Sequence, residues 1–206
     1  MQLSLSYICD KPTRIQQIYS RLMQHYKMSV HMDFMDGHFV PRLGVHPEAV
    51  DELDYAEHVG VHAMIACNNP AWEDILKTRA DVIFAHYESF HSEQQCMDFL
   101  NRDVRLKLAF KPYHTIQQID QICDRLAVDE FLLMAYHPGI KVQDSFYDLS
   151  TLKDYLNTSG RSITIDGGVK LSTVQEFKDQ PRVTLVAGSK VLFNDNYEAN
   201  IECLIS

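Results

Sequence analysis

The chain has 206 residues, with 19 basic and 28 acidic side chains and a formal charge of −9 at pH 7. A length of about 200 residues suits one domain and is also the lower limit for a (β/α)8 barrel. The 46% hydrophobic content is ordinary for a globular core, which argues against a disordered chain. The negative balance argues against a nucleic-acid partner, because neutralising phosphates requires a basic face.

Targeting signals and paired cysteines are both lacking in the sequence. No apolar stretch approaches the ~18–20 residues of a membrane span, and Met1–Ile8 has neither the basic nor the apolar region of a signal peptide. The five cysteines stand at Cys9, Cys67, Cys96, Cys123 and Cys203. Their number is odd and no CxxC pair occurs, so we expect free, mostly buried thiols, a cytoplasmic location and no membrane partner.

Short apolar, β-branched runs alternate along the chain with amphipathic segments. The runs predict strands at Gln2–Ile8, Ser29–Met35, Val59–Ile65, Asp81–Tyr87, Val104–Phe110, Glu130–Tyr136, Ser162–Asp166 and Val183–Ala187. The amphipathic segments predict helices at Thr13–Tyr26, Trp72–Arg79, Ser92–Asn101, Ile116–Leu126, Tyr147–Asn157, Val174–Lys178 and Asn196–Ile205. Between the second and third strands, Pro47–Tyr55 leaves room only for a short helix.

This alternation indicates parallel βαβ units, which form either a closed barrel or an open doubly wound sheet. An open nucleotide-binding sheet usually has a glycine-rich turn after its first strand. Here the first predicted strand is followed by Cys9-Asp10-Lys11-Pro12, without glycine. We therefore expect an α/β fold: a single-domain (β/α)8 TIM barrel over residues 1–206.

Histidine and aspartate side chains fall on three of the predicted strands. His31 and Asp33 alternate on the second strand and so point to one face, His62 lies on the third, and Asp166 ends the seventh. Barrel chemistry gathers at the C-terminal ends of the strands, where two imidazoles and two carboxylates would suit a divalent metal. Taken singly, each residue is more often a satisfied core histidine or a capping aspartate. Their coincidence on three strands favours a metal site.

The segment His31–Pro41, with the sequence HMDFMDGHFVP, resembles the H-x-D-x-M-D-G-x-F-V-P signature of the ribulose-phosphate 3-epimerase family. Further matching segments follow in the same order at Val61–Met64, His86–Glu88, Met134, Pro138–Gly139, Gln143–Phe146, Asp166–Val169 and Val186–Ser189. The resemblance covers essentially the whole chain. It implies a barrel that epimerises a phosphorylated ketose, by default D-ribulose 5-phosphate and D-xylulose 5-phosphate.

The same resemblance implies roles for individual residues. It implies one divalent metal held by His31, Asp33, His62 and Asp166, a donor set that suits Zn, Fe, Mn or Co. It also implies that Asp33 and Asp166 act as the acid/base pair, on either side of a metal-stabilised cis-enediolate. The residues implied to contact the substrate near the reacting carbon are Met35, Met64, Met134 and Ser6, with Ser4 as an alternative to Ser6. Asp36 and His38 either orient the ligands or fix the loop.

Phosphate binding departs from the family pattern. The family's N-P-G-F-G-G-Q-x-F loop is here HPGIKVQDSF, so His137 replaces the asparagine and Lys141-Val142 replaces two glycines. Lys141 supplies a point charge to the phosphate or is a solvated loop residue. Lys111-Pro112 also replaces the family's usual Asn-Pro. The candidate phosphate contacts are His137, Gly139, Lys141, Gly167, Gly168, Gly188 and Ser189.

These departures leave the substrate more open than the reaction. A hexulose phosphate is an alternative substrate, and a catalytically silent metal- and sugar-phosphate-binding barrel is an alternative function. A decarboxylase of the orotidine-phosphate type is disfavoured, because its D-x-K-x-x-D motif is missing where His62–Cys67 stands. The partner expected is a small phosphorylated sugar, and the resemblance also implies a homo-oligomer, at least a dimer.

Overall fold

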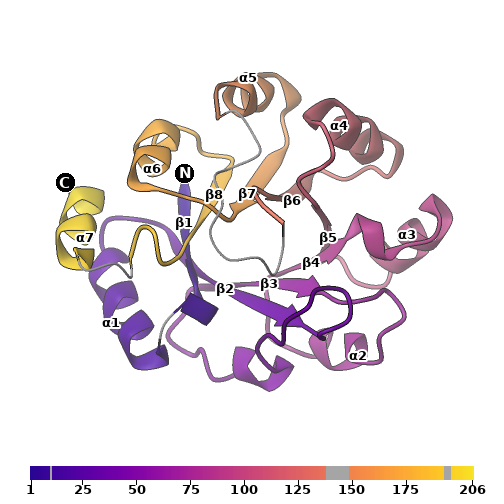
Figure 1. The fold of residues 1–206 in the computed structure, drawn as a ribbon, viewed down its shortest axis with the longest axis horizontal. Helices are drawn as coiled ribbons and strands as arrows, with labels where there is room; N and C mark the ends of the chain where they lie inside the picture. The colour runs from indigo at the N-terminus through magenta and orange to yellow at the C-terminus, as the bar shows by residue number, and fades with distance from the viewer. Residues whose placement is uncertain (10, 138–148, 193–195) are drawn as a thin grey trace.

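The computed structural model describes residues 1–9, 11–137, 149–192 and 196–206. Eight parallel strands follow one another around a closed barrel in the order β1 to β8, with the helices outside it (Figure 1). The barrel closes because β1 pairs with β2 on one side and with β8 on the other. The predicted single-domain (β/α)8 barrel is confirmed, and the open doubly wound sheet is excluded.

The strands agree with the predicted runs to within a few residues. They are β1 Gln2–Ser6, β2 Met28–Met35, β3 His58–Met64, β4 Val82–His86, β5 Leu106–Phe110, β6 Glu130–Met134, β7 Ser162–Asp166 and β8 Val183–Ala187. The α-helices are α1 Pro12–Leu22, α2 Trp72–Ile75, α3 Glu93–Leu100, α4 Ile116–Arg125, α5 Leu149–Ser159, α6 Leu171–Phe177 and α7 Tyr197–Ile205. Short 3-10 helices are η1 Tyr7–Cys9, η2 Pro47–Val50 and η3 Tyr87–Ser89.

Three helices differ from the sequence prediction by three or more residues at one end. Helix α1 stops at Leu22, four residues early, in a turn whose His25 and Tyr26 amides donate to the Leu22 carbonyl. Helix α2 has a single turn instead of reaching Arg79. Helix α6 begins three residues early, at Leu171.

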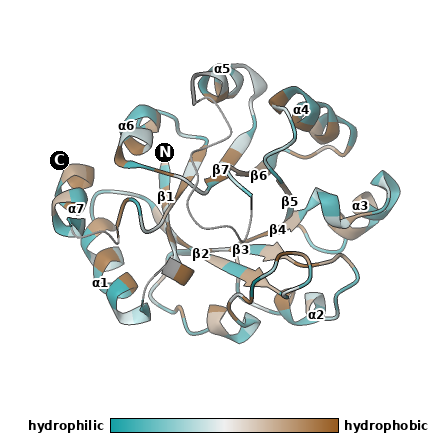
Figure 2. Cartoon of the chain, in the orientation of Figure 1, coloured by the Kyte–Doolittle hydropathy of each residue, from teal (hydrophilic) through white to brown (hydrophobic). Residues whose placement is uncertain are grey.

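The main hydrophobic core lies between the outer face of the barrel and the helices. Alternate strand residues such as Leu3, Leu5 and Val30 pack there with helix residues such as Ile15 and Leu22. A smaller apolar cluster, made of Phe84, Ala109, Leu132 and Met134, joins β4, β5 and β6. Each helix carries both hydrophobic and hydrophilic residues (Figure 2), as expected for a layer between barrel and solvent.

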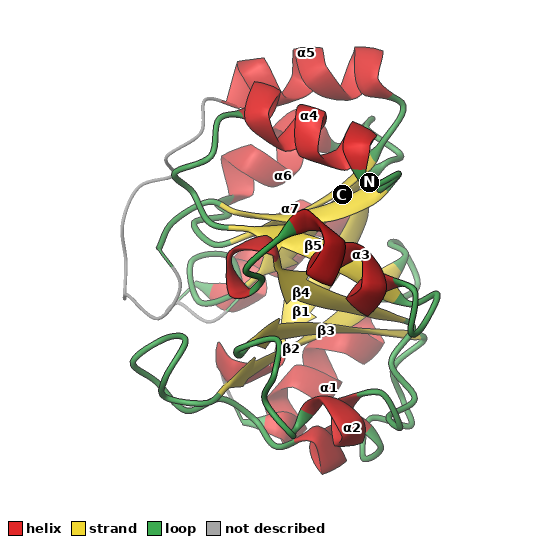
Figure 3. Ribbon diagram, turned by 90° about the vertical axis from the view of Figure 1, so that its right-hand side faces the viewer, coloured by secondary structure: helices red, strands yellow, loops and turns green. Residues whose placement is uncertain are grey.

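A view from the side shows the strands in the middle of the molecule and the helices around them (Figure 3). Several buried polar residues belong to the strands: Ser4 and Ser6 on β1, His31 and Asp33 on β2, and His62 on β3. Buried polar side chains need partners, so the barrel interior is the candidate location of a functional site. Among the helices described, none is both long and apolar enough to cross a membrane.

Candidate active site and metal centre

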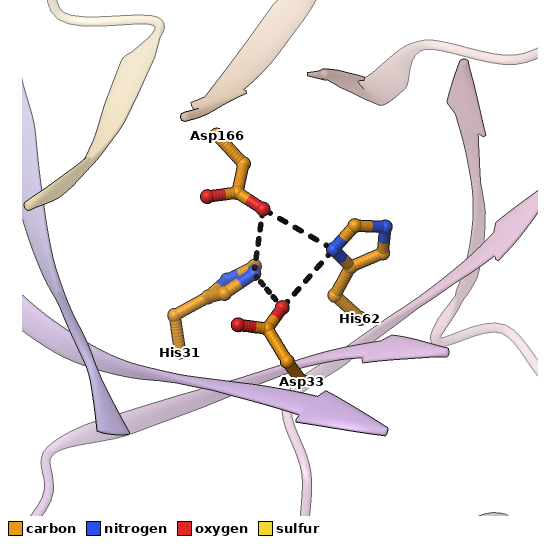
Figure 4. Close-up of side chains that lie close together, drawn as sticks. All are labelled: His31, Asp33, His62 and Asp166. Carbon is orange, nitrogen blue, oxygen red and sulfur yellow. Dashed lines mark hydrogen bonds and ion pairs between the residues drawn. The ribbon is translucent and has the colours of Figure 1, made fainter. Parts of the chain in front are cut away.

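The four predicted ligands meet at the centre of the barrel (Figure 4). His31 and Asp33 alternate on β2, and the β2–β3 register places Asp33 beside His62. Asp166 is the last residue of β7. His31 and His62 are buried almost completely, and Asp33 is only 7% exposed. Barrel closure therefore gathers residues that are up to 135 positions apart in the sequence.

The donor atoms are spaced as ligands of one ion would be. Asp33 Oδ1 lies 3.4 Å from His31 Nε2 and 3.2 Å from His62 Nδ1. Asp166 Oδ2 lies 3.7 Å and 3.3 Å from the same two nitrogens, and all four atoms lie within 4.8 Å of one another. An ion with bonds of about 2.0–2.2 Å needs neighbouring donors about 3.0–3.6 Å apart. Two imidazoles and two carboxylates at this spacing fit a divalent cation.

One nitrogen of the cluster supports that fit independently. His31 Nε2 is buried and has no hydrogen-bond partner among the described residues, although it lies close to two carboxylates. A buried polar atom without a partner is costly, and ligation of an ion is one way to satisfy it. A cation between the donor atoms would satisfy this nitrogen and balance the two negative charges.

The same neighbours shift the pKa values of two members. Burial alone would raise the pKa of Asp33, but the neighbouring His31 and His62 outweigh it and hold that pKa well below its usual range. Burial alone would lower the pKa of His62, but Asp166 and Asp33 together raise it to about 9. Asp33 is therefore an ionised carboxylate at neutral pH, which is the form that binds a cation.

A cavity of about 530 Å³ opens over this cluster. Asp33 and Asp166 line it together with eight of the predicted substrate contacts: Ser6, Met35, Met64, Met134, Gly167, Gly168, Gly188 and Ser189. His137 is not among the described residues that line it, and Gly139 and Lys141 lie outside the described residues. The three methionines and the glycines that follow β7 and β8 thus lie around one cavity.

Three polar residues of the lining were not predicted from the sequence: Arg42, Tyr136 and Lys190. Arg42 directly follows the His31–Pro41 signature and Lys190 directly follows Gly188-Ser189, so adjacency to matched segments was the available signal. Both are cations, which gives the cavity two positive groups near its acidic centre. Tyr136 packs closely on the neighbouring turn, where a Cβ on Gly167 would lie only 2.8 Å from the tyrosine ring.

The loop after β2 is held by Asp36. Its Oδ1 accepts the backbone amides of His38 and Phe39, both at 2.8 Å, and its Oδ2 accepts Asn69 Nδ2 at 3.0 Å. Of the two roles considered for Asp36, these bonds support fixing the loop. The loop then returns along β2, where the Val45 amide donates to the Asp33 carbonyl at 3.0 Å.

Comparison with known proteins identifies the family of this chain. The sequence model of the "Ribulose-phosphate 3 epimerase family" matches residues 2–192. A ribulose-phosphate 3-epimerase from Serratia marcescens is 29% identical over 178 residues, covering 82% of this chain and 84% of the relative. Another from Chlamydia trachomatis serovar D is 27% identical over 187 residues, covering 85% and 79%.

Solved structures show the same architecture at much lower identity. A 3-hexulose-6-phosphate synthase from Salmonella typhimurium has a TM-score of 0.66 at 13% identity, covering 99% of this chain and 96% of that one. A 3-keto-L-gulonate-6-phosphate decarboxylase from Vibrio cholerae has a TM-score of 0.64 at 12% identity, covering 98% and 94%. At such identities the likeness extends to the fold alone. The match to the family model over nearly the whole chain goes further: this protein belongs to the ribulose-phosphate 3-epimerase family and is an enzyme of the isomerase class.

Proposed function

We propose that the protein is a metal-dependent 3-epimerase of a ketose phosphate, with D-ribulose 5-phosphate and D-xylulose 5-phosphate as its default pair. The relatives carry the name of that activity. One observation carries the proposal: two carboxylates, from β2 and β7, meet two imidazoles beneath a cavity large enough for a sugar phosphate. A homodimer or larger assembly belongs to the proposal and rests on the sequence resemblance alone.

Asp33 and Asp166 are the proposed proton carriers. Each turns one oxygen toward the histidines, and Figure 4 shows the second oxygen of each pointing away from His62. Inverting the carbon beside a ketone requires removing a proton from one face and returning one to the other. Two carboxylates from different strands can serve the two faces without turning the substrate over.

His31 and His62 are proposed to share a divalent cation with the two aspartates. When bound, that ion would supply Lewis-acid stabilisation of the charge that develops on the substrate oxygens, worth several kcal/mol. The donor set suits zinc, iron or cobalt, and its carboxylates also admit manganese.

The apolar wall and the glycine turns would position the rest of the substrate. Met64 and Met134 are each 3% exposed and line the cavity with Met35, so this wall excludes water without adding charge. Gly167 and Gly168 have φ values of 98° and 69°, a backbone conformation that glycine adopts without steric cost. We propose that this turn and Lys190 hold the phosphate.

A substrate panel tests the proposed activity. Purified protein reconstituted with Zn²⁺, Mn²⁺, Fe²⁺ or Co²⁺ would be given pentulose and hexulose 5- and 6-phosphates, and the C3 epimer of each would be quantified. Conversion of D-ribulose 5-phosphate with the highest kcat/KM is the expected result. Preference for a hexulose phosphate would change the substrate and keep the reaction, whereas no conversion of any ketose phosphate with metal bound would contradict the proposal.

A further inference from the structure

A chain of buried polar groups lies behind the candidate ligand His62. Its Nε2 atom, on the side of the ring away from the four-residue cluster, is 2.9 Å from His86 Nε2. His86 Nδ1 is in turn 3.0 Å from Glu88 Oε2. Both histidines are fully buried, and the Glu88 side chain is 9% exposed. Nothing in the proposed reaction uses His86 or Glu88.

The surrounding backbone holds this chain in place. His86 ends β4, two residues beyond Phe84, which is in register with His62 on β3. Glu88 lies in η3, where Ser89 Oγ donates to the His86 carbonyl at 2.7 Å. The backbone amide of Lys111 donates to Glu88 Oε1 at 2.7 Å.

Two further contacts limit how the rings and the carboxylate can turn. His114 Nε2 lies 2.9 Å from Glu88 Oε1. The Phe39 ring packs on His86 with 5.0 Å between centroids. Glu88 Oε1 is thus taken by Lys111 and His114, and Oε2 is left for His86.

These contacts fix the direction of every hydrogen bond in the chain. An ionised carboxylate only accepts, so His86 Nδ1 carries a hydrogen and donates it to Glu88. A neutral His86 then offers a lone pair at Nε2, and His62 Nε2 must be the donor to it. A histidine that ligates a metal is neutral, and in that state His62 Nδ1 is the atom left with a lone pair, facing Asp33 Oδ1 and Asp166 Oδ2.

We propose that Glu88 and His86 are positioning residues that hold His62 as the Nε2–H tautomer and so present its Nδ1 atom to the metal. Such hydrogen bonds to the second nitrogen of a ligating histidine commonly orient the ring and raise its basicity. Here the bond reaches the carboxylate through a second histidine. The inference rests on the metal centre proposed above and adds two residues to which that proposal gives no role.

Glu88→Gln should reverse the direction of the hydrogen bonds that run between residue 88, His86 and His62, with little change in side-chain shape. The amide oxygen of the glutamine would stay on the Lys111 amide, so its NH2 group would face His86 Nδ1 and donate to it. His86 Nε2 would then carry the hydrogen, His62 Nε2 would have to accept, and His62 Nδ1 would be protonated where the metal binds. We expect Zn²⁺ affinity, measured by chelator competition, to fall about 10–100-fold.

Glu93→Gln is the matched control. Glu93 forms its ion pair with Arg125 at the surface, away from Glu88, His86 and His62. This variant should bind Zn²⁺ like the wild type. Equal affinities for wild type and Glu88→Gln would overturn the positioning role while leaving the metal centre standing. A wild-type protein that binds no Zn²⁺ would overturn both.

A second measurement needs no variant and covers the case in which Glu88→Gln does not fold. Histidine ¹⁵N NMR of the Zn²⁺-loaded wild type should show His62 with hydrogen on Nε2 and His86 with hydrogen on Nδ1. Hydrogen on His86 Nε2 would contradict the proposed positioning role, because His62 Nε2 would then have to accept that hydrogen bond.

Discussion

Asp166 stands at the end of β7, with its Oδ2 atom 3.3 Å from His62 Nδ1 and 3.7 Å from His31 Nε2. Replacing it with asparagine keeps the shape of the side chain and removes its ability to take up a proton. We expect Asp166→Asn to lower kcat for epimerisation by at least about 10²–10⁴-fold, the usual contribution of a positioned acid/base group. The melting temperature should stay close to that of the wild type.

Asp179→Asn is the control for that variant, because Asp179 is an exposed carboxylate beyond the end of α6. Its kcat should equal that of the wild type. Turnover near the wild-type value in Asp166→Asn would remove Asp166 from the proton-transfer pair and leave it, at most, a ligand.

Glu130, at the start of β6, gives a pH-dependent prediction away from the active site. It lines a second cavity of about 170 Å³ together with Ser4 and Thr164. Burial raises its pKa above the ordinary value of 4.5, so the fold favours its neutral form. Because the unfolded chain loses this proton first, the contribution of Glu130 to stability falls as pH rises from 4.5 through the higher folded-state pKa.

Glu130→Gln should therefore raise the melting temperature at about pH 8 and change it little at about pH 4. Thermal unfolding of both proteins at the two pH values measures this difference. A melting temperature that is equal or lower for the variant at the higher pH would show that the ionised carboxylate has a stabilising partner.

The β2 element depends on Gly44, in the loop that returns along it. The Gly44 amide donates to the Met35 carbonyl, and a Cβ on Gly44 would lie 2.2 Å from the Asp33 carbonyl oxygen. Since the clash is with backbone, β2 or the loop must shift. We expect Gly44→Ala to lower the free energy of unfolding by about 1–3 kcal/mol and to weaken catalysis through Asp33.

Gly60→Ala provides the comparison on the neighbouring strand. A Cβ there would meet Val82 Cγ1 at 3.5 Å and His31 Nδ1 at 3.8 Å, which are ordinary contacts. Denaturant unfolding should show it close to the wild type. If Gly44→Ala and Gly60→Ala were equally stable, the close approach of the loop to β2 would not contribute to the free energy of unfolding.

The strands were predictable from sequence, whereas some helix ends depended on distant contacts. The alternation of residue types along β2 was sufficient to predict that His31 and Asp33 share one face of the strand. The early end of α2 could not be predicted from the local sequence. Arg105 donates hydrogen bonds to the carbonyls of Leu76, Thr78 and Ala80, in the segment where the helix was expected to continue. That arginine lies on another segment, and local propensity carries no information about it.

The candidate site likewise has residues that the sequence predicts and residues that it does not. Its ligands and methionines lie on strands, whose periodicity and order determine where they meet. The cations Arg42 and Lys190 lie beyond strand ends, where the path of the chain and not its periodicity decides what they face. The role inferred for Glu88 likewise needed the hydrogen-bond geometry between β4 and the residue after β5.

At the scale of the whole molecule, the cluster links strands on both sides of the barrel, so binding a cation should stabilise the entire fold. At a Zn²⁺ concentration of about 100 times Kd, the gain is about 2.7 kcal/mol. For a chain of this size that corresponds to a rise in melting temperature of about 5–10 °C. Differential scanning calorimetry with and without Zn²⁺ measures it.

The variant His62→Gln should lose most of that rise, since one ligand is gone. An unchanged rise in this variant would place the bound Zn²⁺ elsewhere in the protein.

The proposed reaction requires this four-residue centre to move a proton at C3 of a ketose phosphate. Its most direct test is solvent exchange: metal-loaded protein is incubated with D-ribulose 5-phosphate in ²H₂O, and deuterium at C3 is followed by NMR. We expect deuterium to enter C3 as xylulose 5-phosphate forms, and we expect chelation of the metal to stop both. Deuterium absent from C3 with metal bound, across pentulose and hexulose phosphates alike, would contradict the proposed reaction.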